Sequence, residues 1–134
     1  MTVTLPVPTE EEEQTWLFEW AERQKNVYPG LELMYHIANE GKRSQTGGRS
    51  LVRQGLKKGV PDICLPVAKG GYHGMYIEMK RTKGGKLGED QRQWLSALTQ
   101  QGYYAVLCKG WEQAKDEIAA YMSGRRKRGT QSEI

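Results

Sequence analysis

The chain is poor in the features that mark secreted, membrane-spanning and fibrous proteins. Its 134 residues contain only two cysteines, and no apolar run approaches the roughly 18–20 residues that span a bilayer. The first residues, MTVTLPVPTEEEE, are acidic and lack the basic-then-apolar pattern of a secretory signal. The sequence shows neither internal repeats nor low-complexity composition. We therefore expect one soluble, cytoplasmic domain with no membrane partner.

The two cysteines, Cys64 and Cys108, each lie inside an apolar run typical of a strand, DICLPV and YYAVLCK. Neither has a histidine or a second cysteine at the spacing of a zinc site. We expect both to be buried free thiols.

Charge is distributed unevenly along the chain. The net charge is +4, yet the first 40 residues are acidic. Lysine and arginine are concentrated at 42–58, 80–86 and 125–128. Such clusters suit a polyphosphate partner, because each cation placed at a phosphate releases a counterion. A solvated surface has the same composition, so charge alone leaves both interpretations open.

Hydrophobic periodicity and turn residues predict an α/β domain. Thr9 and Glu12 form a capping-box pattern at the start of a helix, and a glycine pair at 70–71 marks a hairpin turn. In chain order we expect a helix at 9–25, a strand at 31–37, a polar loop at 38–49, a short helix at 50–58, strands at 60–67 and 72–81, a helix at 89–101, a strand at 103–109 and a helix at 111–122.

These elements predict a small central mixed sheet of about four strands flanked by helices. Residues 1–8 are expected to be flexible. The basic tail at 123–134 has no apolar periodicity and is expected to be disordered. The folded domain is therefore expected at 9–122.

Three polar residues lie in the two middle strands. Asp62 follows Val60-Pro61 in an otherwise apolar strand, and Glu78 and Lys80 are two residues apart on the next strand. Alternate residues of a strand point to the same face. Asp62 and Glu78 are also at similar distances from the turn, so a hairpin can bring them together.

Two carboxylates beside a lysine suit metal-assisted hydrolysis of a phosphodiester. Their oxygens can hold a hard divalent cation such as Mg²⁺, which polarises the phosphodiester and lowers the pKa of a bound water. The lysine can orient that water or stabilise charge on the phosphate. The alternative is structural, with Glu78 and Lys80 as a surface ion pair and Asp62 ending a strand. The strand context and the interval of 16 residues between the two acids favour the active-site interpretation.

The segments GVPD, ending at Asp62, and IEMK, ending at Lys80, resemble the motif of PD-(D/E)XK nucleases. More closely, the chain resembles a stand-alone member of the virus-type replication–repair nucleases, the VRR-NUC domain, from about Glu10 to Ile118. The segments that carry the resemblance are TEEEEQTWLFEWA, HIANEGKRS, GVPDICLP, IEMKRTKGGKLGEDQRQWL and GYYAVLCKGWEQA. The resemblance implies the PD-(D/E)XK nuclease fold.

The resemblance also implies a role for each motif residue. Asp62 and Glu78 would be metal ligands, helped by the main-chain carbonyl of Met79. Lys80 would be the catalytic lysine, and Gln91, which begins the family's Q-x-x-W pattern, would support the site.

A further acid is implied on the first helix. The family's E-x-x-x-Q pattern matches Glu10 and Gln14 and favours Glu10. Glu13 is the alternative, because Glu13 and the apolar residues after it also match related resolvases. Trp94, the last residue of the Q-x-x-W pattern, is expected in the core, and His36 is either structural or catalytic.

The family's Asn-Gly-Gly segment corresponds to Asn39-Glu40-Gly41 in this chain, and this departure leaves the direct role of the loop open. Basic residues after it are candidates for phosphate contacts. The candidates for DNA binding are Asn39, Lys42, Arg43, Arg49, Arg53, Lys57 and Lys58.

The expected function is that of a Mg²⁺- or Mn²⁺-dependent endodeoxyribonuclease with no organic cofactor. Stand-alone family members are similar to Holliday-junction resolvases, which implies a homodimer that cuts branched DNA in the cytoplasm of a bacterial or phage-infected cell. The apolar helices at 9–25 and 111–122 could contribute the dimer interface. The alternatives are a flap or nicking nuclease of the same fold, a non-catalytic DNA-binding module, and a protein-interaction module with a coincidental motif.

Overall fold

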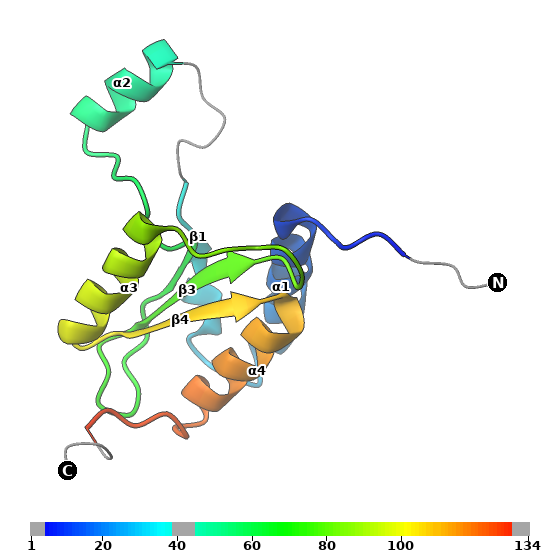
Figure 1. Cartoon of the computed structure of the whole chain (residues 1–134). Helices are drawn as coiled ribbons and strands as arrows, with labels where there is room; N and C mark the ends of the chain where they lie inside the picture. The colour runs from blue at the N-terminus through cyan, green and yellow to red at the C-terminus, as the bar shows by residue number, and fades with distance from the viewer. Residues whose placement is uncertain (1–4, 39–44, 130–134) are drawn as a thin grey trace.

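The computed structural model describes residues 5–38 and 45–129 (Figure 1). Its elements are α1 (Glu10–Gln24), the 3₁₀ helix η1 (Leu31–Leu33), β1 (Tyr35–His36), α2 (Gln45–Arg53), β2 (Ile63–Leu65), β3 (Met75–Lys80), α3 (Glu89–Gln100), β4 (Tyr104–Lys109) and α4 (Trp111–Met122). The strands form one sheet in the order β1-β2-β3-β4, antiparallel except for the parallel pair β3–β4. The expected four-stranded mixed sheet flanked by helices is confirmed. No helix among the described residues is both long and apolar enough to cross a membrane.

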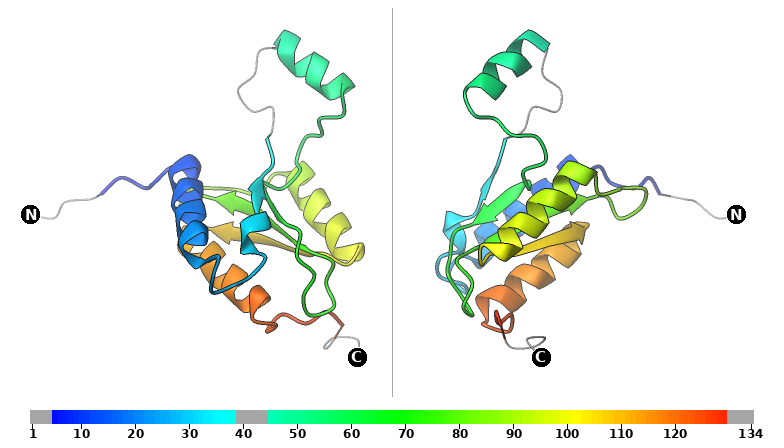
Figure 2. Two further views of the ribbon diagram at one scale, coloured as in Figure 1. Left: turned by 180° about the vertical axis from the view of Figure 1, so that it is seen from behind. Right: turned by 60° about the vertical axis from the view of Figure 1, so that its left-hand side comes forward.

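Different helices cover the two faces of the sheet (Figure 2). On one face of β3, Ile77 and Met79 are buried in the main core with Leu17 of α1 and Ile118 of α4. Because strand residues alternate between faces, Glu78 points to the opposite face, which α3 covers. No residue of α3 is fully buried. The α3 face therefore has the thinner cover, and this is the face that carries the charged residues.

The start of α1 follows the expected capping box. The Oγ1 of Thr9 accepts the N–H of Glu12 at 3.0 Å, and the Glu12 carboxylate accepts the N–H of Thr9 at 2.9 Å. These two bonds satisfy main-chain donors that the first helical turn leaves unpaired. Leu17 and Ala21 then bury one side of the helix in the core.

Three expected elements between residues 31 and 58 differ from the structure, and residues 39–44 of the expected loop lie outside the described part of the chain. The strand expected at 31–37 shrinks to β1, because the N–H of Leu33 bonds to the carbonyl of Gly30 at 3.0 Å and the chain forms a 3₁₀ turn first. The loop expected at 38–49 and the helix at 50–58 also differ, since α2 covers Gln45–Arg53. Glycines at 47 and 48 suggested a loop, but their helical cost of about 1 kcal/mol each is only a weak preference.

The basic tail also differs from the expected disorder over 123–129. The Nε of Arg126 donates to the Tyr104 hydroxyl at 2.8 Å and to the Glu117 carboxylate at 3.1 Å. The N–H of Arg128 bonds to the carbonyl of Gly70 at 2.8 Å. The tail therefore packs on the hairpin turn and on β4, through contacts that its lack of apolar periodicity did not indicate.

Both cysteines are buried free thiols, as expected. Cys64 lies on β2 and Cys108 on β4. Burial raises the pKa of Cys108 to about 12, so its thiol stays protonated at neutral pH.

Candidate active site

The hairpin of β2 and β3 brings the two acidic motif residues together. Ile63 pairs with Ile77 in antiparallel register. One further step along both strands places Asp62 opposite Glu78, with both side chains on the α3 face. Lys80 follows two residues later on that same face. The three residues that the sequence singled out thus lie beside one another.

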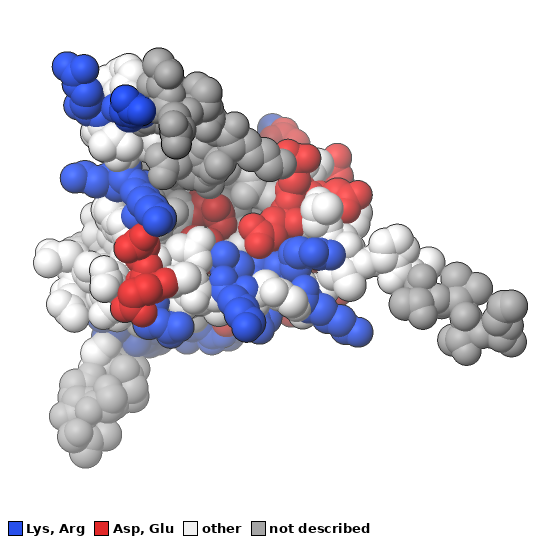
Figure 3. Space-filling model, turned by 45° about the horizontal axis from the view of Figure 1, so that its top comes forward, with Lys and Arg blue, Asp and Glu red and all other residues white. Residues whose placement is uncertain are grey.

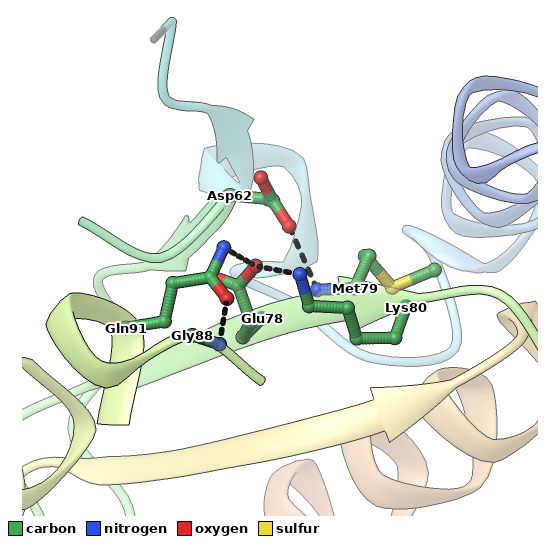
Figure 4. Close-up of polar contacts among 6 residues, drawn as sticks. All are labelled: Asp62, Glu78, Met79, Lys80, Gly88 and Gln91. Atoms are coloured by element: carbon green, nitrogen blue, oxygen red, sulfur yellow. Dashed lines mark hydrogen bonds and ion pairs between the residues drawn. The ribbon is translucent and has the colours of Figure 1, made fainter. Parts of the chain in front are cut away.

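The side-chain amide of Gln91, on α3, holds Glu78 in place (Figure 4). Its Oε2 accepts the Nε2 of Gln91 at 3.0 Å, and the Oε1 of Gln91 in turn accepts the N–H of Gly88 at 2.8 Å. The Nζ of Lys80 lies 3.7 Å from the same Glu78 oxygen. The second oxygen, Oε1, is buried and has no hydrogen-bond partner among the described residues. A buried, unpaired carboxylate oxygen is costly, so this oxygen favours a proton or a cation beside it.

Asp62 is held by the main chain of the neighbouring strand. Its Oδ2 accepts the N–H of Met79 at 2.8 Å (Figure 4). In a strand the N–H and the carbonyl of one residue point to the same side. The carbonyl of Met79 therefore points toward Asp62 as well, just beyond Ile63, the first residue of β2.

Burial raises the pKa of both carboxylates. Glu78 is 2% exposed; burial, followed by the charge of Asp62, raises its pKa to about 8, although the ammonium of Lys80 opposes the shift. Burial also raises the pKa of Asp62, against the hydrogen bond from Met79. Two buried carboxylates this close cannot both be ionised without compensation. The pair therefore favours a proton or a cation between its oxygens.

The donor set fits a divalent metal ion. Mg²⁺ prefers oxygen ligands and is commonly held by one or two carboxylates together with waters and substrate phosphates. Asp62 and Glu78 supply two converging carboxylates, one of them with an unpaired oxygen. Within residues 5–38 and 45–129, no group of three or more acidic, histidine or cysteine side chains is placed to enclose a metal. Water and substrate oxygens would therefore have to complete the coordination.

The two candidate acids of α1 have different surroundings. Glu13 is 3% exposed, and its Oε1 accepts the N–H of Trp111 at 2.9 Å. Gly110 offers α4 no side-chain cap, so Glu13 caps that helix from α1. Glu10 is exposed, and its charge is close enough to raise the pKa of Glu78. Glu13 thus links two helices, whereas the charge of Glu10 acts on Glu78.

His36 links α1 to the residue that carries the first motif acid. Its Nδ1 lies 3.1 Å from the amide Nε2 of Gln14 and 3.1 Å from the main-chain carbonyl of Asp62. That carbonyl also accepts the N–H of Ile37 at 2.7 Å. His36 contacts the main chain of Asp62 and not its carboxylate, which is the geometry of a positioning residue.

Trp94 differs from the core position expected for it. The side chain is half-buried, and its indole N–H donates to the carbonyl of Lys58 at 3.1 Å. Next to Lys58, Gly59 has a φ of +90°, and a Cβ there would lie 2.7 Å from the Cβ of Asp90 on α3. α3 therefore approaches the segment before Asp62 closely, and only glycine fits at position 59.

Of the expected DNA-contact residues, the structure describes four, and one of them, Lys58, pairs with Asp90 on α3 at 3.5 Å. Asn39, Lys42 and Arg43 lie outside the described residues. The others are exposed, on or just after α2, which stands apart from the sheet in both figures of the ribbon (Figures 1 and 2): Arg49, Arg53, Lys57 and Lys58.

Sequence reasoning missed the contacts that hold the site from outside. The guanidinium of Arg81 donates to the carbonyls of Val7, at 3.2 Å, and Pro8, at 3.3 Å. These bonds fasten the segment before α1 to the end of β3. Main-chain acceptors leave no sequence signal, because every residue has a carbonyl. Gly88 was missed for the same reason, since it acts through its N–H.

Comparisons with known proteins agree with this arrangement. The sequence model of the VRR-NUC domain family matches residues 8–112. A solved structure of a VRR_NUC domain protein is similar to this chain, with a TM-score of 0.80 and 29% sequence identity, covering 96% of this chain and 99% of that one. No curated protein matches the sequence. The matched span runs from before α1 to the start of α4 and contains every site residue described above.

Proposed function

This chain belongs to the VRR-NUC family of nucleases, and on that premise we propose that it is a metal-dependent DNA endonuclease. We propose branched DNA as its substrate, with the four-way Holliday junction as the preferred form. One observation carries the proposal. Asp62 and Glu78 converge beside Lys80, and one buried oxygen of Glu78 has no partner in the described structure. Such a set suits phosphodiester hydrolysis better than a structural ion pair, which would leave no oxygen unpaired.

Asp62, Glu78 and the main-chain carbonyl of Met79 would hold Mg²⁺ or Mn²⁺, with Glu10 adding negative charge from α1. When bound, the ion would polarise the phosphodiester and lower the pKa of the attacking water. Gln91 keeps one Glu78 oxygen turned toward α3, so the other oxygen stays free for a ligand.

Lys80 would act on the charge that develops in the reaction. Its side chain lies beside Glu78 and is only 10% exposed, so water screens its charge weakly. The ammonium can donate to the attacking water and to a non-bridging phosphate oxygen. Both contacts strengthen as negative charge grows in the transition state. No covalent intermediate is part of this scheme.

We also propose that the active species is a homodimer, because one chain carries one carboxylate pair and a junction requires two cuts. The apolar faces of α1 and α4 pack against each other within the chain, so they are not free for an interface. Trp16 and Tyr35 remain 39% and 50% exposed, and aromatic side chains are enriched in protein interfaces. These residues are better candidates for the contact with a second copy.

The test is cleavage of an end-labelled four-way junction beside linear duplex, flap and single-stranded DNA. Each substrate is incubated with Mg²⁺, Mn²⁺ or EDTA, for the wild-type chain and for Lys80→Ala. Light scattering of the free chain and of its junction complex gives the oligomeric state. We expect paired nicks in the junction, lost both with EDTA and with Lys80→Ala, from a dimer.

Cutting of flaps or of plain duplex instead would keep the nuclease mechanism and reject the junction as substrate. Binding of DNA without cleavage under every metal condition would reject the catalytic proposal. A monomer that still makes paired nicks would reject the homodimer.

A further inference from the structure

The loop between β3 and α3, residues 81–88, is attached to the site at both ends. It begins directly after Lys80 and ends at Gly88, whose N–H binds the Gln91 that holds Glu78. Between these points the loop doubles back, because a Cβ placed on Gly85 would lie 3.1 Å from the Cβ of Lys80. The bonds of Arg81 to the segment before α1 hold the loop from the other side.

Two lysines of this loop carry unneutralised charge. Lys83 and Lys86 are exposed, and no acidic side chain in the described part of the chain pairs with either. Other lysines differ in this respect, since Lys25 lies against Glu22 and Lys58 lies 3.5 Å from Asp90. The loop thus presents, beside the site, two lysines that have no acidic partner among the described residues.

A third lysine reaches the same place from β4. Lys109 is the register partner of Lys80 in the parallel pair β3–β4. Neighbouring strands lie about 4.8 Å apart and paired residues share a face, so the Lys109 side chain emerges next to that of Lys80. It is exposed, and the described residues offer it no acidic partner. In Figure 3 basic side chains gather beside acidic ones on this side of the molecule.

We propose that Lys83, Lys86 and Lys109 form a phosphate-binding rim, which holds the DNA backbone at the nucleotides next to the scissile phosphate. This inference rests on the proposed nuclease function, and it identifies the surface that would bind the DNA backbone of the substrate. The carboxylate pair by itself repels a phosphodiester chain, so cations close to it are needed to hold the strand there. The rim supplies them from the end of β4 and from a loop whose two ends lie at Lys80 and at the Gly88 that binds Gln91.

The first test measures binding separately from cleavage. Lys80→Ala serves as the parent, and DNA affinity is followed by fluorescence anisotropy at increasing salt. Each rim lysine is replaced by glutamine, singly and together, and Lys69→Gln serves as the matched control, because Lys69 is exposed in the turn that precedes β3, at the opposite end of that strand from Lys80. We expect the slope of log affinity against log salt to fall by about one for each rim lysine removed, and not to change for Lys69→Gln.

A slope unchanged in the triple variant would overturn the rim and leave the nuclease proposal in place. A parent that binds no DNA would overturn both. In the otherwise wild-type chain, the rim variants should raise KM and leave kcat within a few-fold. A fall in kcat with unchanged affinity would overturn the rim, because the lysines would then act in the chemistry.

A second test locates the rim on the DNA. Both natural cysteines are buried, so a cysteine introduced by Lys86→Cys can be labelled selectively with a photoactivated crosslinker. We expect crosslinks at the nucleotides that flank the cut. Crosslinks spread along the DNA, or equal to those from Lys69→Cys, would overturn the placement.

Discussion

The two faces of β3 show how one short strand serves two purposes. On one face, Ile77 and Met79 are sealed by α1 and α4 in the main core. On the other, Glu78 and Lys80 are also nearly inaccessible, but amide and ammonium groups surround them instead of apolar side chains. Burial on the first face stabilises the fold, whereas burial on the second raises a carboxylate pKa. Neighbouring residues of β3 should therefore separate stability from activity.

The largest effect is expected from Lys80→Ala on the charged face. Removing a donor that stabilises transition-state charge lowers rates by about 10²–10³-fold. Single-turnover cleavage at saturating DNA measures the loss, and thermal melting checks that the variant is folded. Ile77→Val, on the opposite face, is the control and should cost about 0.5–1.5 kcal/mol of stability with cleavage retained. Equal losses of cleavage in both variants would contradict the division between the faces.

Ile77→Ala should show the converse behaviour. Truncating a side chain with 0% exposure in the core removes apolar contacts and leaves a cavity, at a cost of about 2–5 kcal/mol. Chemical denaturation measures the change, and cleavage per folded molecule should remain near that of the wild type. A destabilisation below that of Ile77→Val would show that this face is not the main source of stability.

The pH dependence of stability is expected to come from the charged face. The folded pKa of Glu78 is about 8, above its ordinary value of 4.5, so the folded state binds this proton more tightly than the unfolded state does. Stability from this group is therefore complete below about pH 4.5 and is lost as pH rises through about 8. Thermal melts in EDTA should show wild-type stability falling relative to Glu78→Gln over this interval, and Mg²⁺ should reverse the fall. A difference that is flat with pH would contradict the raised pKa.

The smallest effect is expected from the two acids of α1. Glu13→Ala removes the cap of α4 and should cost about 1–2 kcal/mol, seen in chemical denaturation. Glu10→Ala, on the same helix but exposed, should change stability by less than about 0.5 kcal/mol and should reduce cleavage. Loss of cleavage at constant stability in Glu13→Ala, with Glu10→Ala unaffected, would reverse their roles.

Local patterns predicted much of the fold and part of the site. The alternation and the glycine turn predicted the hairpin, and the capping box predicted the start of α1. The strand expected at 31–37 was wrong, and so was the loop over 45–49, where α2 forms instead. Both predictions rested on weak local preferences, which tertiary contacts override. Trp94 was expected in the core, but no residue of α3 is fully buried, and the Trp94 indole N–H instead binds the carbonyl of Lys58.

The convergence of Asp62 and Glu78 beside Lys80 follows from strand alternation around one turn, which is a property of a continuous stretch of sequence. The choice between Glu10 and Glu13 does not, since both lie in the first turn of the same helix. The difference between these two acids depends on the packing of α4, where Trp111, 98 residues after Glu13, donates its N–H to the Glu13 carboxylate. The return of the β3–α3 loop over Lys80 and the placement of Lys109 beside it likewise depend on contacts between packed elements. Short-range periodicity determines which face a side chain occupies, but only the packing of distant segments determines what it meets there.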